Sequence, residues 1–176
     1  MYKRQVESHP DIVSAIHREY VAAGADIIET DTFGANRLRL APYGLADRVS
    51  RINRRAAQLA REARDVAGRD VLVAGSMGPL AAPIHPDRPD GPTMRAVVRE
   101  QVEGLLEGGA DLLVFETASH LEDLLLAVTE ARGLTDLPIV ASMTFGEDLL
   151  AVIGTTPEAA ARALAAAGVD ALGTNC

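Results

Sequence analysis

Apolar and polar positions alternate along the chain in two different periods. Short extended runs, typical of strands, lie at 26–33, 71–75, 111–116, 138–145 and 171–175. A helical segment precedes each run, at 10–23, 45–66, 93–107, 121–132 and 157–167. In the first of these, Ile12, Ile16 and Tyr20 recur four residues apart, which is the spacing of one helix face. The pattern therefore predicts five helix-strand units in succession.

Cap and turn residues support these boundaries. Ser8 is the predicted cap of the first helix, and Thr155 or Thr156 caps the last one, with Pro157 in its first turn. Three helix-to-strand junctions share one sequence motif: Gly24-Ala25-Asp26, Gly109-Ala110-Asp111 and Gly168-Val169-Asp170. Each motif predicts a glycine in the left-handed conformation that ends a helix, followed by an acidic residue where the strand begins.

The regular alternation predicts an α/β fold with a parallel sheet. A doubly wound sheet would carry a loop such as G-x-G-x-x-G after its first strand, and no strand here is followed by one. A (β/α)8 TIM barrel has eight strands, so we expect a truncated barrel holding about strands 2 to 6. Residues 1–5 are polar and patternless and are interpreted as a foreign N-terminal segment; residues 6–176 are the partial barrel domain.

Composition narrows the class of protein. The chain has 176 residues, 48% of them hydrophobic, and a formal net charge of -8. No apolar stretch approaches the roughly 18 residues of a membrane helix. An acidic chain repels nucleic acid and anionic lipid, so we expect neither as a partner. The single cysteine and the lack of a secretory signal predict a cytoplasmic location.

The predicted strands turn polar at their carboxyl ends, where parallel α/β folds place their ligands. Glu116 follows a fully apolar run, so its carboxylate lies at the edge of a buried layer. From position alone, Glu116 either binds a substrate ammonium group or is a structural carboxylate paired with backbone N–H groups or an arginine. Glu29 and Asp31 share one side of their strand, and the pattern leaves open which side faces inward.

Other candidate chemistry is weaker. Ser76 lies outside any G-x-S-x-G elbow, which argues against a serine hydrolase, and the glycine-rich turn around it either approaches a ligand or only joins a strand to a loop. Cys176 is either a core cysteine or one metal ligand, since catalytic zinc takes about three protein ligands. Of the histidines, only His120 lies near a strand end, whereas His85 lies in a proline-rich loop.

Four motifs, in this order along the chain, carry a family resemblance. They are Glu29-Thr30-Asp31-Thr32-Phe33-Gly34-Ala35-Asn36-Arg37, Gly75-Ser76-Met77-Gly78-Pro79, Phe115-Glu116-Thr117 and Gly173-Thr174-Asn175-Cys176. Together they closely resemble the homocysteine S-methyltransferase family, most of all the bacterial form fused to a methylenetetrahydrofolate reductase-like domain. The resemblance implies a (β/α)8 barrel that transfers a methyl group to the homocysteine thiolate to form methionine.

The resemblance also implies site residues and a cofactor. The family's zinc ion is held by three cysteines, of which Cys176 matches the first; the other two, an adjacent pair, have no counterpart in this chain. Glu116 would hold the amino group of homocysteine. Thr117, Thr32, Phe33, Ser76 and Asn175 would also line the substrate pocket, although Asp31 stands where the family more often has Asn. The methyl donor remains open among betaine, S-methylmethionine and methylfolate.

Three functions stay in competition at this point. The first is a fragment of a zinc-dependent homocysteine S-methyltransferase, expected to be inactive alone because two zinc ligands are lacking. The second is a different TIM-barrel enzyme, which would need a phosphate site near strands seven and eight. The third is a non-catalytic barrel remnant that acts as a binding or assembly module.

Overall fold

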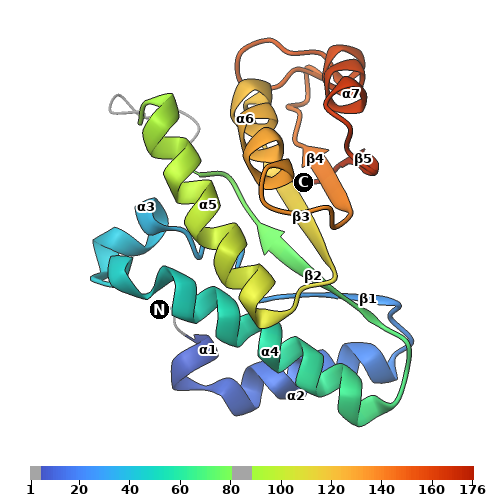
Figure 1. Ribbon diagram of the computed structural model, residues 1–176. Helices are drawn as coiled ribbons and strands as arrows, with labels where there is room; N and C mark the ends of the chain where they lie inside the picture. Colours follow the sequence, from blue (N-terminus) through green and yellow to red (C-terminus); the bar gives the residue numbers. More distant parts are fainter. Residues whose placement is uncertain (1–4, 81–88) are drawn as a thin grey trace.

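The computed structural model describes residues 5–80 and 89–176, and within them five strands form one parallel sheet in sequence order (Figure 1). The strands are β1 (Ile27–Glu29), β2 (Leu72–Met77), β3 (Leu112–Ala118), β4 (Ile139–Met143) and β5 (Ala171–Thr174). The long helices are α2 (Pro10–Ala22), α4 (Val49–Ala67), α5 (Gly91–Gly108), α6 (Leu121–Arg132) and α7 (Pro157–Ala166). The predicted alternation is therefore confirmed, and the parallel order is that of consecutive barrel strands.

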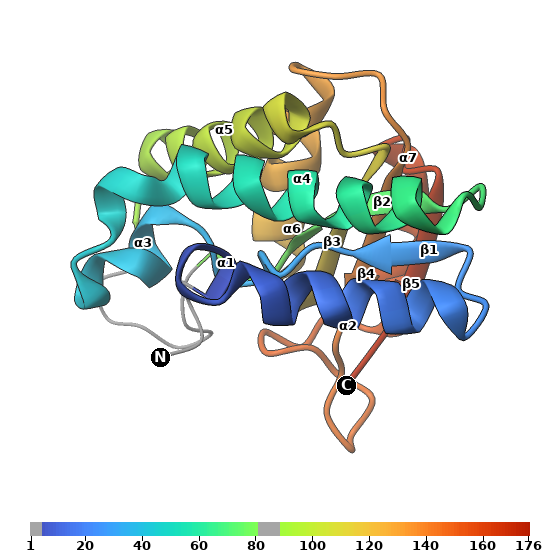
Figure 2. The ribbon, with the colours of Figure 1, turned by 90° about the horizontal axis from the view of Figure 1, so that it is seen from below.

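Helices cover one face of the sheet. Leu113, Phe115 and Ile139 point to that side and join residues of α5, α6 and α7 in the largest apolar cluster. The opposite face holds a smaller cluster of Ala74, Leu112 and Val114, against which Val140 packs. At the β1 end of the sheet, α2 packs against α4 (Figure 2). Successive residues of a strand point to opposite faces, so this second face is the inner wall of the barrel arc.

The three repeated junctions have the backbone that their sequence predicts. Gly24, Gly109 and Gly168 have φ angles of 104°, 84° and 74°, in the region that L-residues with a Cβ rarely adopt. These glycines turn the chain from each helix into the next strand, which is the predicted left-handed helix ending.

The acidic residue of two junctions ties the new strand to the preceding one. Asp111 Oδ2 accepts hydrogen bonds from the backbone N–H of Val73 at 2.7 Å and from Arg64 Nη1 at 2.8 Å. Asp170 Oδ2 likewise accepts from the Ile139 N–H at 2.8 Å and from the Arg132 guanidinium. These bonds hold the pKa of the Asp170 carboxyl below its usual value. Each carboxylate therefore links a helix, its own strand entrance and the preceding strand.

Some boundaries differ from the predictions. The residues before α2 form a short helix, α1 (Gln5–Ser8), so the Ser8 cap is wrong: the N-cap of α2 is His9, which makes no capping hydrogen bond with its side chain. Thr156 does cap α7, accepting from the Ala159 N–H at 3.2 Å. A further short helix, α3 (Arg37–Leu40), was not predicted; the side chain of Asn36 caps it.

Two predicted features lie partly or wholly outside the described residues. Residues 1–4 belong to the segment interpreted as foreign, of which only Gln5 is described, as the first residue of α1. His85 and most of the proline-rich loop after β2 fall within 81–88. The expectations for these stretches stay predictions.

The apolar stripe predicted for the first helix does not face the core. Ile12, Ile16 and Tyr20 are 52%, 48% and 64% exposed, whereas the buried face of α2 carries Val13, His17 and Val21. The exposed stripe lines a hollow of about 550 Å³ beside the open edge of β1. A second hollow, of about 460 Å³, lies at the other end of the sheet between β5 and α7. Both outer strands of the arc thus border apolar hollows.

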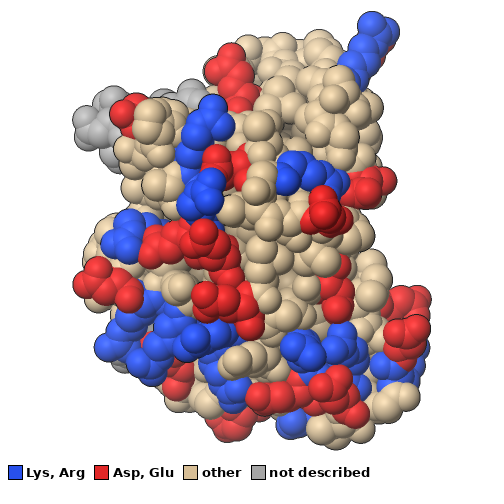
Figure 3. Space-filling model, viewed as in Figure 1, with Lys and Arg blue, Asp and Glu red and all other residues tan. Residues whose placement is uncertain are grey.

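The outer surface shown in Figure 3 mixes charges of both signs. Ion pairs between elements include Arg37 with Glu100 at 2.6 Å and Arg54 with Glu107 at 3.7 Å. In residues 5–80 and 89–176, no helix is both long and apolar enough to span a bilayer.

We expect Asp111→Ala to lower the free energy of unfolding by about 1–3 kcal/mol, because it leaves the Val73 N–H and the Arg64 guanidinium without their shared acceptor. Asp65→Ala is the matched control: Asp65 also contacts Arg64, but its side chain is 63% exposed, so we expect a change within about 0.5 kcal/mol. Urea unfolding followed by circular dichroism measures both. Equal effects of the two substitutions would contradict this role for Asp111.

Candidate functional site

The strand register brings polar side chains to the carboxyl-terminal rim of the inner face. Glu29 pairs with Ala74, and Ser76 pairs with Val114, so these residues project to the same side of the sheet. Glu116 lies two residues beyond Val114 and shares its face. The open question of which way Glu29 points is therefore answered: it faces inward, together with Ser76 and Glu116.

Glu116 is held at this rim by a neighbouring strand. The Ser76 hydroxyl donates a hydrogen bond to Glu116 Oε1 at 2.5 Å, and Ser76 itself is 2% exposed. Burial first, then the negative charge of Glu116 and the hydrogen bond to it, raise the pKa of Glu29. No arginine bonds Glu116 in the described chain, which weakens the structural alternative for this residue.

Thr30 and Thr32 join β1 to β2 through their side chains. Their hydroxyls lie 2.5 Å apart; Thr32 Oγ1 donates to the Ser76 carbonyl at 2.7 Å, and Thr30 Oγ1 accepts from the Ser76 N–H at 3.1 Å. Gln101, from α5, donates to the Thr32 carbonyl at 2.9 Å. Thr32 is 1% exposed, so it supports Ser76 from behind and has little surface of its own for a ligand.

Phe33 lies over the turn that follows β2. A Cβ added to Gly78 would lie only 2.6 Å from the nearest atoms of the Phe33 ring. The Gly78 N–H donates a hydrogen bond to the Phe33 carbonyl at 2.9 Å. The glycine of this turn therefore makes room for Phe33. Phe33 remains 43% exposed, so part of its surface is open to a ligand.

Asn175 connects the ends of β3 and β5. Its Oδ1 accepts from the Thr117 N–H at 2.9 Å, and its Nδ2 donates to Thr117 Oγ1 at 2.8 Å. Thr117 has a φ of 57°, a strained conformation for a β-branched residue that this two-point contact stabilises. The Cys176 sulfur lies next to the pair, 3.7 Å from Asn175 Nδ2 and 4.0 Å from Thr117 Oγ1. The rim thus continues from Glu116 to an exposed thiol.

A zinc ion fits this chain only in part. Cys176 is exposed at a strand end and its sulfur is open to a ligand, as a metal-binding thiolate requires. Yet no group of three or more His, Cys, Asp or Glu side chains suitable for a metal occurs among the described residues. The described part of the chain therefore offers one sulfur and no complete zinc site.

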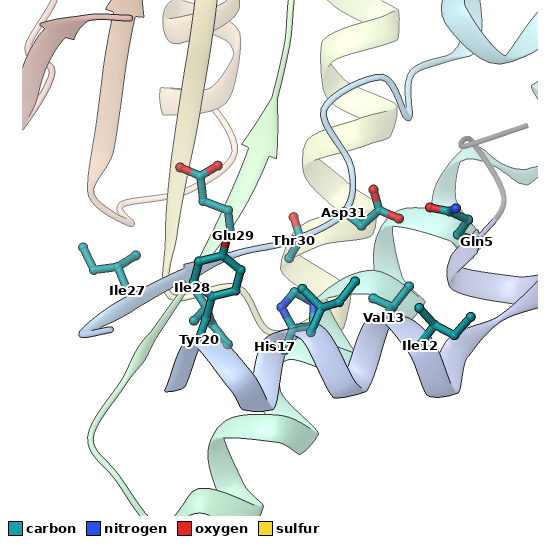
Figure 4. Close-up of a pocket in the computed structure, with 11 residues that line it drawn as sticks. Gln5, Ile12, Val13, His17, Tyr20, Ile27, Ile28, Glu29, Thr30 and Asp31 are labelled. Carbon is teal, nitrogen blue, oxygen red and sulfur yellow. The ribbon is translucent and has the colours of Figure 1, made fainter. Parts of the chain in front are cut away.

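The hollow beside β1 meets the rim only at its edge. Figure 4 shows the Glu29 side chain pointing away from α2, while His17 and Asp31 lie along the hollow. His17 Nε2 is buried without a hydrogen-bond partner in the described chain, and burial lowers the pKa of His17. Asp31 keeps exposed surface, but partial desolvation raises its pKa to about 6. Asp31 thus lines the hollow beside α2, whereas the Glu29 side chain points away from α2.

The structure thus places the sequence-predicted residues in one connected strip, and adds two that were missed. Glu29 had no predicted role, because the sequence pattern left open which face of β1 it lies on. The strand register decides this. Gln101 lies in a helix among apolar residues, and a buried amide at such a position is itself a sign of a hydrogen-bonded partner. His120 is the N-cap of α6 and forms no described contact with the rim residues.

Comparison with known proteins assigns the family. The sequence model of the family described as homocysteine S-methyltransferase matches residues 2–176. The chain belongs to the homocysteine S-methyltransferase family. The four sequence motifs that carry the resemblance all lie within the matched region, and three of them supply the rim residues Glu29, Ser76 and Glu116.

Two relatives within the family carry different names and differ in how much of their length this chain covers. The chain is 34% identical over 178 residues to the methionine synthase of Mycobacterium tuberculosis, which covers 97% of this chain and 15% of that protein. It is 32% identical over 172 residues to betaine–homocysteine S-methyltransferase 1 of Sus scrofa, covering 96% of this chain and 60% of that protein. The chain therefore spans only part of the length of these relatives.

Solved structures agree with the partial barrel. The metallated form of the homocysteine methyltransferase MmuM from Escherichia coli superposes with a TM-score of 0.88 at 27% identity, over 99% of this chain and 66% of that one. The carboxyl transferase domain of Rhizobium etli pyruvate carboxylase superposes with a TM-score of 0.59 at 15% identity, which shows the fold alone. The family's TIM-barrel fold, present in part, is thereby confirmed.

We expect Asp31 to make stability depend on pH. Its folded-state pKa of about 6 lies above the unfolded value of 3.8, so the folded state holds the proton more tightly. Its stabilising effect is complete below pH 3.8 and is lost as the pH rises through about 6. Asp31→Asn should remove this loss, gaining on the order of 1 kcal/mol relative to wild type between pH 4 and pH 7 after screening is discounted. Thermal unfolding of both proteins across this range tests it; parallel curves would contradict it.

Proposed function

We propose that this chain is the homocysteine-binding part of a homocysteine S-methyltransferase, which transfers a methyl group to the homocysteine thiolate and forms methionine. The observation that carries the proposal is the strip that runs from Glu116 through Thr117 and Asn175 to Cys176 along one rim of the sheet. A carboxylate at one end and a thiol at the other match the two ends of an amino acid that carries an ammonium group and a sulfur.

Glu116 is the proposed partner of the homocysteine ammonium group. Its carboxylate is half-buried above the apolar layer of Leu112 and Val114, where an ionic hydrogen bond is stronger than in water. Ser76 occupies one direction of approach to Oε1 and so leaves the remaining lone pairs of Glu116 for a ligand. Phe33, with an exposed ring, is proposed to cover the aliphatic part of the substrate.

Cys176 is the proposed first zinc ligand, and the contacts of Asn175 and Thr117 orient its sulfur. A zinc ion would keep the substrate sulfur as a thiolate near neutral pH, where a free thiol with a pKa of about 8.5 is mostly protonated. The two further cysteines that the family resemblance implies are not in this sequence, in which Cys176 is the single cysteine. The donor stays open among betaine, S-methylmethionine and methylfolate, because no rim residue distinguishes them.

We expect Glu116→Gln to weaken homocysteine binding by roughly 10- to 100-fold, because the amide cannot form the ionic hydrogen bond to an ammonium group. Isothermal titration calorimetry of this chain with homocysteine measures the loss. Glu122→Gln, an equal change of charge at an exposed position of α6, is the control and should bind as wild type does. Unchanged affinity in Glu116→Gln would refute the assignment, provided that circular dichroism shows the variant folded.

We also expect the chain by itself not to form methionine, since it offers one of about three zinc ligands. The assay combines the purified chain, zinc and homocysteine with each of the three donors in turn. Turnover that exceeds the protein-free reaction with any donor, and that Cys176→Ser abolishes, would show that a complete site exists without further segments.

A further inference from the structure

The Ser76 peptide lies just beyond the point where β1 stops pairing with β2. Alternate residues of β2 direct their backbone groups toward β1, and the Ala74 carbonyl accepts from the Thr30 N–H at 2.9 Å. Ser76 is next in this series. β1 ends at Glu29, however, and the Thr30 carbonyl accepts from the Thr32 N–H at 2.8 Å instead. The Ser76 N–H and carbonyl therefore need other partners on this side.

Two threonine hydroxyls supply these partners and form a ring of hydrogen bonds with one direction. Thr30 Oγ1 accepts from the Ser76 N–H at 3.1 Å, and Thr32 Oγ1 donates to the Ser76 carbonyl at 2.7 Å. The two hydroxyl oxygens lie 2.5 Å apart. A hydroxyl has one proton, and Thr32 gives its proton to the Ser76 carbonyl, so Thr30 is the donor between them. Thr30 thus connects both ends of the ring.

The ring determines where the Ser76 hydroxyl can lie. Thr30 and Ser76 are 4% and 2% exposed, so water does not readily replace a lost partner. A serine side chain has one heavy-atom torsion, so the orientation of its backbone sets the positions open to Oγ. That Oγ donates to Glu116 Oε1 at 2.5 Å, and hydrogen bonds weaken steeply as their geometry worsens. A rotated Ser76 peptide would therefore release Glu116.

We propose that Thr30 is a positioning residue whose hydroxyl orients Ser76 and, through Ser76, the Glu116 carboxylate. This inference rests on the proposed function in one respect: it takes Glu116 as the residue that binds the homocysteine ammonium group. Thr30 is buried and is not among the residues proposed to touch the substrate. It acts on binding only through its hydrogen bonds to its neighbours.

Thr30→Val replaces the hydroxyl with a methyl group of similar size. It should weaken homocysteine binding about tenfold, because a displaced Glu116 forms a poorer ionic hydrogen bond. Thr30→Ser keeps the hydroxyl and should stay within about threefold of wild type. Thr129→Val, the same change at an exposed position of α6, is the control and should bind as wild type does. Isothermal titration calorimetry measures the affinities, and circular dichroism verifies folding. Equal affinities of the Val and Ser variants at position 30 would contradict the inference.

A double-mutant cycle separates positioning from a merely structural role. In Ser76→Ala the connection from Thr30 to Glu116 is already broken. Adding Thr30→Val to that variant should therefore change homocysteine affinity by less than about twofold. A further loss as large as that of Thr30→Val alone would show that Thr30 affects binding by another route, and would overturn the inference.

NMR tests the same connection without a ligand. The carbon-13 resonance of the Glu116 carboxyl group should shift in the same direction in Thr30→Val as in Ser76→Ala, and should keep its wild-type position in Thr30→Ser. In the unaltered chain the Ser76 amide should exchange slowly with solvent, because its N–H is buried and bonded to Thr30. Exchange at the rate of a free amide would overturn the inference even if Thr30→Val did not fold.

These measurements distinguish failure of the inference from failure of the proposed function. If the Glu116 resonance responds to Thr30→Val but Glu116→Gln binds homocysteine as wild type does, Thr30 positions Glu116 and the proposed function fails. If Glu116→Gln weakens binding while Thr30→Val changes neither the resonance nor the affinity, the proposed function stands and this inference is wrong.

Discussion

The parallel register of β1, β2 and β3 is the constraint on which the candidate site depends. It sets Glu29 beside Ala74 and Ser76 beside Val114. The polar side chains of Glu29, Ser76 and Glu116, from three strands, therefore lie on one face. A shift of one residue in any strand would turn that side chain toward the helices. The Asp111 carboxylate, which binds the Val73 N–H across the start of β2 and β3, holds this register at the opposite end of the strands.

The inner face changes from apolar to polar along the strands, and this gradient gives the rim its chemistry. Ala74, Leu112 and Val114 form a buried apolar layer next to Ser76 and Glu116. A carboxylate at the edge of such a layer loses hydration, so it depends on the hydrogen-bond donors that the protein supplies. Ser76 is one donor, and Thr32 supports it from behind by bonding its carbonyl. The position of Glu116 at the rim therefore depends on the buried hydrogen bonds of Ser76 and Thr32.

Much of the fold was predictable because helix and strand periods differ and because glycines mark three junctions. The predictions failed where tertiary contacts overrode local pattern. Ile12, Ile16 and Tyr20 have the spacing of a core-facing stripe, yet α4 packs on the Val13 and Val21 side of α2. The apolar run at β1 also suggested a longer strand. Its last residues instead direct their hydroxyls to β2, as the contacts of Thr32 with Ser76 show.

The sequence by itself determined the alternation of elements, the family motifs and the candidate residues Glu116, Asn175 and Cys176, because each is encoded in spacing or in a contiguous phrase. Only the tertiary structure decided how these residues relate. The hydrogen bond of Ser76 to Glu116 and the two-point contact of Asn175 with Thr117 join residues that are 40 and 58 positions apart. Strand register brings residues so far apart in sequence into contact, and this register depends on packing across the whole sheet rather than on any local signal.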